Sequence, residues 1–460
     1  MNDLSDKRVV VVGLARSGEA ACRLLLKQGA AVVGTDRRDE REIGDDLCSL
    51  ERDGVSLELG ERYLRSLLAA DCVVVSPGVD LRESPFARVR KAGIPLIGEV
   101  ELAYRYSEAT FIGVTGTNGK STTTTLLGLI LKQAGMPAHV AGNIGTPLCR
   151  VAPSLSAGEY VIAELSSFQL ETIGTFRPHV ALLLNLAPDH LDRYDQVEDY
   201  YRAKARIFEN QRSSDIAVIN ADDPVTLQAA SQTRGRRIGF SRVGSHVEGA
   251  CVEDGQLVLA LNGKREAICP VSELKILGVH NLENALAAGL AAAALGVPPE
   301  TIRTALTGFE GLEHRLECVA EIGGVRYVND SKGTNVGAVI RSLESFTDPI
   351  VLIAGGRDKH GDFTPLLPLV RERVKRLILI GEAAGVMRRA LASACETEEA
   401  PTLEGAVRRA AVIASPGEVV LLSPACASFD MFTDFEERGR VFKAAVRGLL
   451  PPADSIRGQA

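Results

Sequence analysis

The chain has 460 residues, of which 45% are hydrophobic and 24% charged, and its formal net charge is −7. These values are typical of a folded protein of about three domains, and they argue against a disordered chain or a general nucleic-acid binder. The first residues lack the apolar run of a signal peptide, and no later stretch is long enough to span a membrane, so a cytoplasmic location without a membrane segment is expected. Nine dispersed cysteines without a Cys-x-x-Cys pair predict reduced thiols rather than disulfides or zinc.

The first domain is expected over residues 1–98 and begins with the strand-turn-helix-strand order of a Rossmann unit, ending at Asp36. Ala15 replaces the glycine at which the backbone would come closest to a pyrophosphate. Nucleotide binding and plain packing therefore remain equally compatible with this unit, and NAD is disfavoured. A later strand breaks at Ser76-Pro77-Gly78, again a tight turn at a strand end. The expected elements are strands at 8–12, 31–35 and 71–75, a turn at 13–18 and a helix at 20–28.

The second domain, expected over residues 99–308, carries a glycine-rich loop at 115–122 between an apolar strand and a helix. Its glycines let backbone N–H groups approach phosphate oxygens, while Lys120 can reach the outer phosphates and Ser121 can ligate magnesium. Val114 stands where the strict pattern has its first glycine, so the loop is a variant. A turn that binds nothing is disfavoured by the strand before it and the helix after it.

Three further features of this domain suggest chemistry. Glu164 ends a strand at 160–163, where a phosphate-loop fold places a magnesium partner. His190 follows the strand at 182–184, and a helix at about 197–208 presents Lys204. Taken alone, His190 would more often be structural and Lys204 solvated. Hairpin signals at Asp254-Gly255 and Asn262-Gly263 predict a small β appendage over 251–270, followed by an Ala-rich helix up to about Leu295.

The third domain, expected over residues 309–460, alternates apolar strands with helical segments and predicts a Rossmann-like parallel sheet. Ligands bind at the carboxyl ends of strands in such sheets, so the loops after three of them should face a common cleft. The strands are expected at 326–328, 350–354, 376–380 and 418–422, and the loops at 330–335, 355–359 and 423–428.

The motifs taken together resemble the Mur ligases of bacterial peptidoglycan synthesis over nearly the whole chain. They are Gly-Thr-Asn-Gly-Lys-Ser-Thr at 116–122, Gly-Asn-Ile-Gly at 142–145, Glu-Leu-Ser-Ser-Phe-Gln-Leu-Glu at 164–171, Asp-His-Leu-Asp-Arg at 189–193, His280-Asn281-x-x-Asn284 and Asn-Asp-Ser-Lys at 329–332. The resemblance implies an α/β protein with an N-terminal Rossmann-like domain, a central ATPase-like domain and a C-terminal Rossmann-like domain. Within the family, the segments at 76–78, 166–169, 314–317, 423–430 and 435–439 are most similar to the subgroup that adds D-glutamate to UDP-N-acetylmuramoyl-L-alanine.

The resemblance also implies roles for individual residues. ATP is expected at Gly116, Thr117, Asn118, Gly119, Lys120, Ser121, Thr122, Asn281, Arg315 and Asp330. The UDP-substrate is expected at Ser17, Asp36, Arg38, Ser76, Gly78, Asn143, Gln169 and His190. D-glutamate is expected at Thr334, Lys359, Ser428, Phe429 and Phe435. The implied catalytic residues are Lys120, Glu164, His190 and Lys204, and the implied ligands of two magnesium ions are Ser121, Glu164, His190 and Lys204 as a carbamate. Arg37 stands where the family usually has a small hydroxyl residue.

The implied mechanism passes the ATP γ-phosphate to the substrate carboxylate, and the D-glutamate amine then attacks the acyl phosphate. In the family the matching lysine is carbamylated by carbon dioxide. Only a neutral amine reacts with it, and with an ordinary pKa of ~10.4 roughly one lysine in a few thousand is neutral at pH 7, so a depressed pKa is expected for Lys204. Closure about a hinge near Gly308 to Gly311 would complete the site. A cytoplasmic monomer is expected, acting on small molecules and binding neither nucleic acid nor membrane.

Three other functions remain open at this point. A related ligase could add a different amino acid, or act on folate, although a folate enzyme lacks such a UDP-binding unit. A nicotinamide-dependent oxidoreductase could be built on residues 13–36, and Ala15 disfavours it. A nucleotide-binding regulator would bind or hydrolyse ATP without any muramyl substrate.

Overall fold

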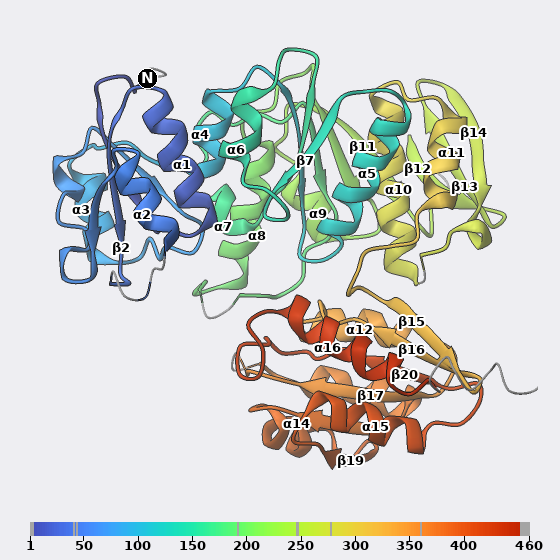
Figure 1. The fold of residues 1–460 in the computed structure, drawn as a ribbon. Coiled ribbons are helices and arrows are strands. Elements are labelled where there is room, and N and C mark those ends of the chain that lie inside the picture. The colour runs from blue at the N-terminus through green and yellow to red at the C-terminus, as the bar shows by residue number, and fades with distance from the viewer. Residues whose placement is uncertain are drawn as a thin grey trace, which may run out of the picture. The chain divides into compact units, whose positions relative to one another are not determined.

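The computed structural model describes residues 4–39, 42, 45–190, 193–244, 248–276, 278–358 and 361–450. These residues form the predicted α/β fold with three separate sheets (Figure 1). The chain divides into two compact units, one made of 1–273 with 283–307 and the other of 274–282 with 308–460. No described helix combines the length and the apolar character needed to cross a membrane.

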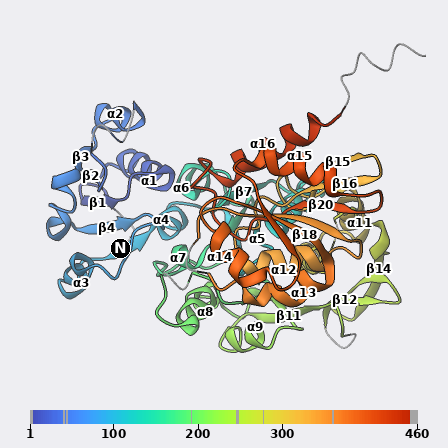
Figure 2. The same cartoon turned by 90° about the horizontal axis from the view of Figure 1, so that it is seen from below.

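The first sheet is wholly parallel, in the order β3-β2-β1-β4-β5. Apolar side chains of β1 alternate between its two faces: Val9 and Val11 pack with α1 and α2, whereas Val10 and Val12 pack with α3. Figure 2 shows these helices on opposite sides of the sheet. The elements are β1 (Arg8–Val12), α1 (Arg16–Lys27), β2 (Ala31–Asp36), α2 (Asp45–Arg52), β3 (Ser56–Leu59), β4 (Cys72–Val75), α3 (Ser84–Lys91) and β5 (Leu96–Gly98).

Helix α1 begins at Arg16, four residues earlier than the sequence predicts. Three residues of the predicted turn therefore form the first helical turn, and Ala15 is the N-cap residue. The early start depends on Gly18, because a Cβ there would lie 1.8 Å from the carbonyl oxygen of Gly13. The helix N-terminus consequently lies directly against the end of β1.

The second sheet has the order β14-β13-β12-β11-β10-β9-β6-β8-β7 and is parallel except at β12-β13-β14. The two predicted hairpins are confirmed, with positive φ at Asp254, Gly255, Asn262 and Gly263. They extend the central sheet through a parallel β11·β12 pair rather than forming a separate appendage.

Helix α5 packs on β7 and β8 of this sheet. One apolar cluster continues from the α1 face of the first sheet into the second. The strands are β6 (Thr110–Thr115), β7 (Ala138–Gly142), β8 (Tyr160–Glu164), β9 (Val180–Leu183), β10 (Ile216–Asn220), β11 (Arg236–Ser241), β12 (Gly249–Glu253), β13 (Gln256–Leu261) and β14 (Lys264–Pro270). The helices are α4 (Glu99–Arg105), α5 (Lys120–Gln133), α6 (Leu148–Val151), α7 (Ser167–Leu170), α8 (Val197–Ala205), α9 (Pro224–Ala229), α10 (Val279–Ala294) and α11 (Pro299–Gly308).

The third sheet has the order β15-β16-β20-β17-β18-β19, and its only antiparallel pair among the described strands is β15·β16. Helices α12, α13 and α14 pack on one face, while α15 and α16 pack on the other. The elements are β15 (Glu317–Ile322), β16 (Val325–Asn329), α12 (Val336–Glu344), β17 (Ile350–Gly355), α13 (Leu367–Arg373), β18 (Val374–Ile380), α14 (Ala384–Leu391), β19 (Glu396–Glu399), α15 (Leu403–Ile413), β20 (Val419–Leu422) and α16 (Phe435–Arg447).

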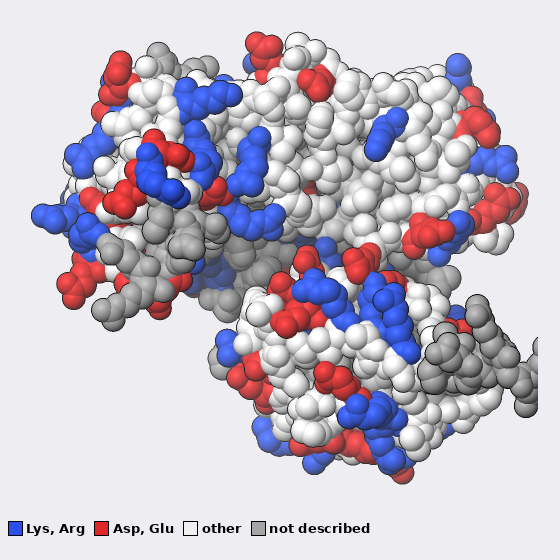
Figure 3. All heavy atoms as spheres, viewed as in Figure 1, with Lys and Arg blue, Asp and Glu red and all other residues white. Residues whose placement is uncertain are grey.

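Charged side chains are mixed in sign on the face drawn in Figure 3. Lys and Arg groups alternate there with Asp and Glu groups, separated by uncharged surface. Among the described residues of this face, no continuous basic area of the kind that nucleic acid requires is visible.

Candidate active site

The glycine-rich loop connects β6 to the start of α5. Gly119 is the N-cap residue of α5 and has φ +85°, and a Cβ there would lie 2.2 Å from Asn284 Oδ1. A side chain at this position would therefore face both backbone strain and a collision. Lys120 is the first residue of the helix, so the loop presents backbone N–H groups at the helix N-terminus, the geometry that binds phosphate.

Asn185 holds the loop in place. Its Oδ1 accepts from the backbone N–H of Asn118 at 2.9 Å, and its Nδ2 donates to the Asn118 carbonyl at 3.0 Å. The Asn185 carbonyl in turn accepts from the N–H of Thr117 at 2.9 Å. We assigned Asn185 no role from the sequence, although its place directly after β9, the neighbour of β6, was a usable signal.

Two lysines point at the same backbone oxygen of the loop. Lys120 Nζ donates to the carbonyls of Gly116 at 2.9 Å and Thr117 at 2.8 Å. Lys204 Nζ, from α8, also donates to the Gly116 carbonyl at 2.9 Å. The structure thus brings together two lysine side chains that lie 84 positions apart in the sequence, at the loop where a triphosphate is expected.

Lys204 is fully enclosed, with 2% of the residue exposed. Burial lowers its pKa well below the ordinary value, and the charge of Lys120 lowers it further, whereas Asp189 and Glu164 oppose the shift. The ammonium lies 4.8 Å from the centroid of the Tyr200 ring. The surroundings therefore favour the neutral amine, as we expected for a lysine that reacts with carbon dioxide.

Glu164 ends β8 beside the phosphate loop, where its register partner on β6 is Val114. The residue is 1% exposed, and its Oε1 accepts from Asn143 Nδ2 at 2.8 Å. Its Oε2 is buried and has no hydrogen-bond partner among the described residues. A buried carboxylate oxygen without a partner is costly unless a cation occupies the adjoining space, so Glu164 fits a magnesium ligand.

His190 lies at the tip of the segment after β9 and has φ +55°, which is unusual for a residue other than glycine. Its ring packs edge-on against Phe168, with centroids 4.9 Å apart, and its Nε2 lies 3.9 Å from Asp189 Oδ2. The His190 and Tyr200 ring centroids are 6.0 Å apart. Tyr200 thus lies within reach of both His190 and Lys204.

A cavity of about 530 Å³ lies between the first sheet and the 142–147 segment of the same unit. Six of the residues predicted for the UDP-substrate line it, whereas Arg38 and His190 do not. The six are Ser17, Asp36, Ser76, Gly78, Asn143 and Gln169.

Arg38 does not line the cavity itself but is bonded to Asp36, which does. Arg38 donates through Nε to Asp36 Oδ1 at 3.0 Å and through Nη2 to Oδ2 at 2.9 Å. The N–H of Leu14 donates to Oδ2 at 2.8 Å. Burial acts to raise the pKa of Asp36, but these hydrogen bonds outweigh it and keep the pKa below its usual value.

Two arginines that the sequence did not assign to the substrate also line the cavity. Arg16 donates to the carbonyl of Gly145 across the cavity rim. The Arg37 guanidinium lies 5.2 Å from the Tyr63 ring centroid and forms an ion pair with Glu83. Arg16 and Arg37 adjoin Ser17 and Asp36, which the sequence predicts as substrate-binding residues. No sequence pattern indicated that Tyr63 would line the cavity.

In the second unit, hydrogen bonds join the three loops that we expected to share a cleft. The N–H of Gly355 donates to Pro424 at 2.8 Å, and that of Ala425 donates to Gly333 at 2.9 Å. Ser428 is buried, Thr334 and Phe435 are half-buried, and Phe429 is 62% exposed. Lys359 lies outside the described residues.

Asp330, one of the predicted ATP residues of the second unit, is buried. Asp330 accepts from the hydroxyls of Ser342 and Ser423, both at 2.7 Å. Burial raises its pKa, and the charge of Arg315 opposes that shift. The same arginine helps burial to lower the pKa of His280, which precedes Asn281, to about 3. Arg315 therefore lies close to both segments.

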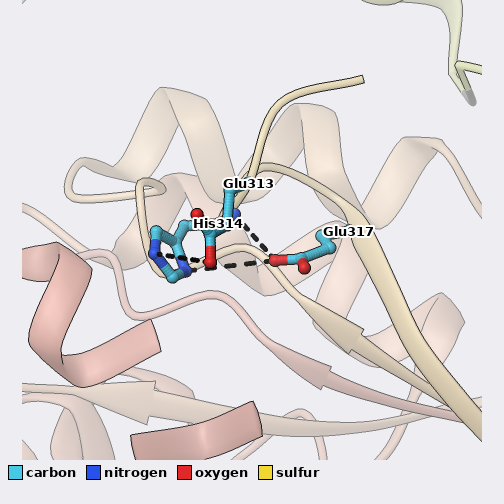
Figure 4. Close-up of side chains that lie close together, drawn as sticks. All are labelled: Glu313, His314 and Glu317. Carbon is cyan, nitrogen blue, oxygen red and sulfur yellow. Dashed lines mark hydrogen bonds and ion pairs between the residues drawn. The ribbon is translucent and has the colours of Figure 1, made fainter. Parts of the chain in front are cut away.

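Glu313, His314 and Glu317 form the single group of potential metal ligands found among the described residues (Figure 4). Lys443 Nζ donates to Glu313 Oε1 at 2.8 Å and to Glu317 Oε1 at 2.6 Å. Because Lys443 already bonds both carboxylates, we interpret the group as structural.

Comparison with known proteins matches three family models along the chain. They are described as the Mur ligase MurD-like N-terminal domain over residues 7–98, the Mur ligase middle domain over 114–292 and the Mur ligase glutamate ligase domain over 314–426. A UDP-N-acetylmuramoylalanine--D-glutamate ligase from Pelotomaculum thermopropionicum is 47% identical over 452 residues, which cover 98% of this chain and 99% of the relative. One of the same name from Geotalea daltonii is 47% identical over 447 residues, covering 97% and 98%.

Solved structures show the same fold at low sequence identity. A pseudomurein peptide ligase type C from Methanothermus fervidus superposes with a TM-score of 0.62 at 18% identity, covering 96% of this chain and all of the other. A MurF ligase from Thermotoga maritima in complex with ADP gives a TM-score of 0.62 at 17% identity, with coverage of 98% and 100%.

Proposed function

The chain belongs to the Mur ligase family, and we propose that it joins D-glutamate to UDP-N-acetylmuramoyl-L-alanine with ATP converted to ADP and phosphate. Relatives of that name match it at 47% identity over nearly its full length. The observation in the structure that supports an ATP-dependent ligase best is the convergence of Lys120 and Lys204 on the Gly116 carbonyl at the start of a phosphate-binding helix.

The first chemical step brings two anions together, so cations and exact positioning must supply most of the rate enhancement. The γ-phosphoryl group moves from ATP to a carboxylate oxygen of the L-alanine residue, and ADP leaves. Lys120 and the loop N–H groups stabilise the charge on the transferred group, and Asn185 keeps those N–H groups in place. When bound, magnesium would neutralise phosphate oxygens, held by the Ser121 hydroxyl and the unpartnered Oε2 of Glu164.

The second step makes the amide bond. The D-glutamate amine attacks the carbonyl carbon of the acyl phosphate, loses a proton, and inorganic phosphate leaves with the oxygen that came from the carboxylate. Water must be kept away from the acyl phosphate, because hydrolysis would waste the ATP. We propose that Thr334, Ser428, Phe429 and Phe435, with Lys359, bind D-glutamate, and that Asn281, Arg315 and Asp330 complete the ATP site.

Lys204 is proposed to carry a carbamate. Its neutral amine would form an N–C bond with carbon dioxide and release a proton, which converts the neutral side chain into an anion suited to a second magnesium ion alongside His190. NMR of the protein equilibrated with isotope-labelled bicarbonate should show a carbamate signal that is absent in Lys204→Ala and retained in Lys132→Ala, a change at an exposed lysine. A signal that persists in Lys204→Ala would rule the assignment out.

The cavity beside the first sheet is proposed to bind the UDP part of the substrate. Its volume of about 530 Å³ lies in the range usual for small-ligand sites, and the N-terminus of α1 with Ser17 opens into it. Arg16 adds a positive charge suited to a diphosphate, and Arg37, which is paired with Glu83, lies on the same lining. Asn143 links this cavity to the magnesium site, because it lines the cavity and donates to Glu164.

We further propose that the protein works as a monomer in the cytoplasm, in the synthesis of peptidoglycan precursors and thus in cell shape and division. All residues assigned to the three substrates come from one chain, so a partner subunit is not needed for a complete site. Light scattering during gel filtration tests the monomer, and a stable dimer at assay concentrations would contradict it.

Phosphate release from ATP tests the activity, with UDP-N-acetylmuramoyl-L-alanine and a panel of amino acids. D-glutamate should stimulate release strongly. Heavy oxygen placed in the substrate carboxylate should appear in the released phosphate, as an acyl phosphate requires. Stimulation only by L-lysine, diaminopimelate or L-alanine would contradict the substrate assignment, and an unlabelled phosphate would contradict the intermediate.

A further inference from the structure

Arg438 in the first turn of α16 is fully buried, and its guanidinium lies among neutral oxygen atoms. Nη2 donates to the Ser331 carbonyl at 2.8 Å, and Nε donates to the Ser331 hydroxyl at 3.0 Å. Nη1 and Nη2 both donate to the Cys426 carbonyl at 3.2 Å, and Nη1 also donates to Ala427 at 3.3 Å. None of these acceptors is a carboxylate, which is unusual for a buried arginine.

The charge of this guanidinium persists at neutral pH. Burial lowers the pKa of Arg438 to about 10, and nearby groups, among them Asp430 and Asp330, oppose the shift. An ion enclosed without a direct ion pair is stable only if its donors are satisfied, and here every one of its three nitrogens makes at least one hydrogen bond. An apolar side chain of similar size could make none of these hydrogen bonds.

The acceptors of Arg438 belong to two loops at the carboxyl ends of neighbouring strands. Ser331 follows β16, while Cys426 and Ala427 follow β20, and these two strands pair in parallel. The third loop joins at the same point, because the N–H of Arg357 donates to the Ala427 carbonyl at 2.9 Å. Arg438 therefore bonds two of the loops directly, and the Ala427 carbonyl, which also accepts from the N–H of Arg357, joins the third loop to them.

The same hydrogen-bond system reaches back to the helix that carries Arg438. The Ser331 hydroxyl accepts from Arg438 Nε and donates to the Phe435 carbonyl at 2.7 Å, which closes a ring between the loop and the first turn of α16. Phe435 itself is one of the residues proposed for D-glutamate, and Ser428 directly follows Ala427. Movement of the guanidinium would therefore shift residues on two sides of the proposed pocket.

We infer that Arg438 is the positioning residue of the amino-acid pocket, fixing the loops after β16, β17 and β20 in the arrangement that receives D-glutamate. The inference rests on the proposed function for the identity of the amino acid. Arginine is required because its planar fork reaches four acceptors in fixed directions, whereas a lysine ammonium on a flexible stem would satisfy only some of them.

The test compares Arg438→Lys and Arg438→Met with Arg440→Lys, a control at an exposed arginine of the same helix. The KM of each of the three substrates is measured by phosphate release, and unfolding is followed by circular dichroism. In Arg438→Lys the KM for D-glutamate should rise roughly tenfold or more, as expected for the loss of a charge-assisted hydrogen bond. The KM for the UDP-substrate should stay within about twofold, the KM for ATP should rise less than that for D-glutamate because Asp330 adjoins Ser331, and Arg440→Lys should match the wild type.

A purely structural role predicts a different result: fewer folded molecules and a lower kcat, with all three KM values unchanged. That outcome in Arg438→Lys would overturn the inference, and this variant carries the test if Arg438→Met fails to fold. If the wild type uses another amino acid instead of D-glutamate, the proposed substrate is wrong, and the KM of that other amino acid then tests Arg438 independently.

Discussion

Replacing Asn185 with alanine should weaken ATP binding by an amount that the structure allows us to estimate. The substitution removes two buried side-chain hydrogen bonds, of 2.9 and 3.0 Å, that hold the backbone of Asn118 in the phosphate loop. Each such bond contributes about 1 kcal/mol, so the loop conformation that binds phosphate should be less stable by about 2 kcal/mol. If ATP must restore that shape, its KM should rise ~30-fold, since 1.4 kcal/mol corresponds to tenfold.

The matched control for this prediction is Asn210→Ala, which also removes two side-chain hydrogen bonds, to Gly174 and Phe176. It should lower the unfolding temperature and leave the KM for ATP unchanged. Phosphate-release kinetics with varied ATP, together with thermal unfolding of both variants, provide the comparison. An Asn185→Ala enzyme with a wild-type KM for ATP would refute the idea that Asn185 holds the loop in its phosphate-binding conformation. An equal change of the KM for ATP in Asn210→Ala would refute it as well.

Three further changes have definite expected outcomes. Lys204→Met should be more stable than the wild type at pH 7 in carbon-dioxide-free buffer, because the unfolded chain binds a proton there that folding must remove. The pH-dependent part of this difference should disappear as the pH rises towards ~10.4, and a stability difference that stays constant with pH, measured by urea unfolding, would contradict the lowered pKa. Glu164→Gln should raise the magnesium concentration needed for half-maximal activity at least roughly tenfold, and an unchanged magnesium titration would exclude Glu164 as a ligand. Burial raises the pKa of Glu99 to about 7. The free energy of unfolding of the wild type should therefore fall by about 3 kcal/mol relative to that of Glu99→Gln between pH ~4.5 and 7, and should not change further above pH 7. A difference in unfolding free energy that is independent of pH, measured by urea unfolding, would show that Glu99 does not titrate in this way.

The features that local chemistry determines were predictable from the sequence. The two hairpins follow from Asp254-Gly255 and Asn262-Gly263, because only a few residue types tolerate positive φ at both central positions of such turns. The three α/β sheets follow from apolar strands alternating with helical segments. The glycine-rich loop likewise predicts a strand end followed by a helix start, and β6 and α5 occupy those places.

The features that the sequence did not predict depend on tertiary contacts. Helix α1 starts at Arg16 because Gly18 permits contact with the Gly13 carbonyl, which periodicity cannot reveal. Arg38 is not among the residues that line the cavity and forms two hydrogen bonds with Asp36, a carboxylate two residues away. Strand β15 escaped prediction because it is a half-exposed edge strand without a continuous apolar run. The task of Arg438 is visible only once distant loops are placed beside it, whereas for Asn185 the position after β9 was a usable signal.

The most direct test of the central claim is the mass of the UDP-linked product. The purified protein is incubated with ATP, magnesium, UDP-N-acetylmuramoyl-L-alanine and D-glutamate, and the UDP compounds are separated and weighed by mass spectrometry. We expect the substrate to gain the mass of one glutamate residue, with one ADP and one phosphate formed per product. ATP consumption with an unchanged UDP-substrate, or equal product from L-glutamate, would contradict a D-glutamate-adding ligase.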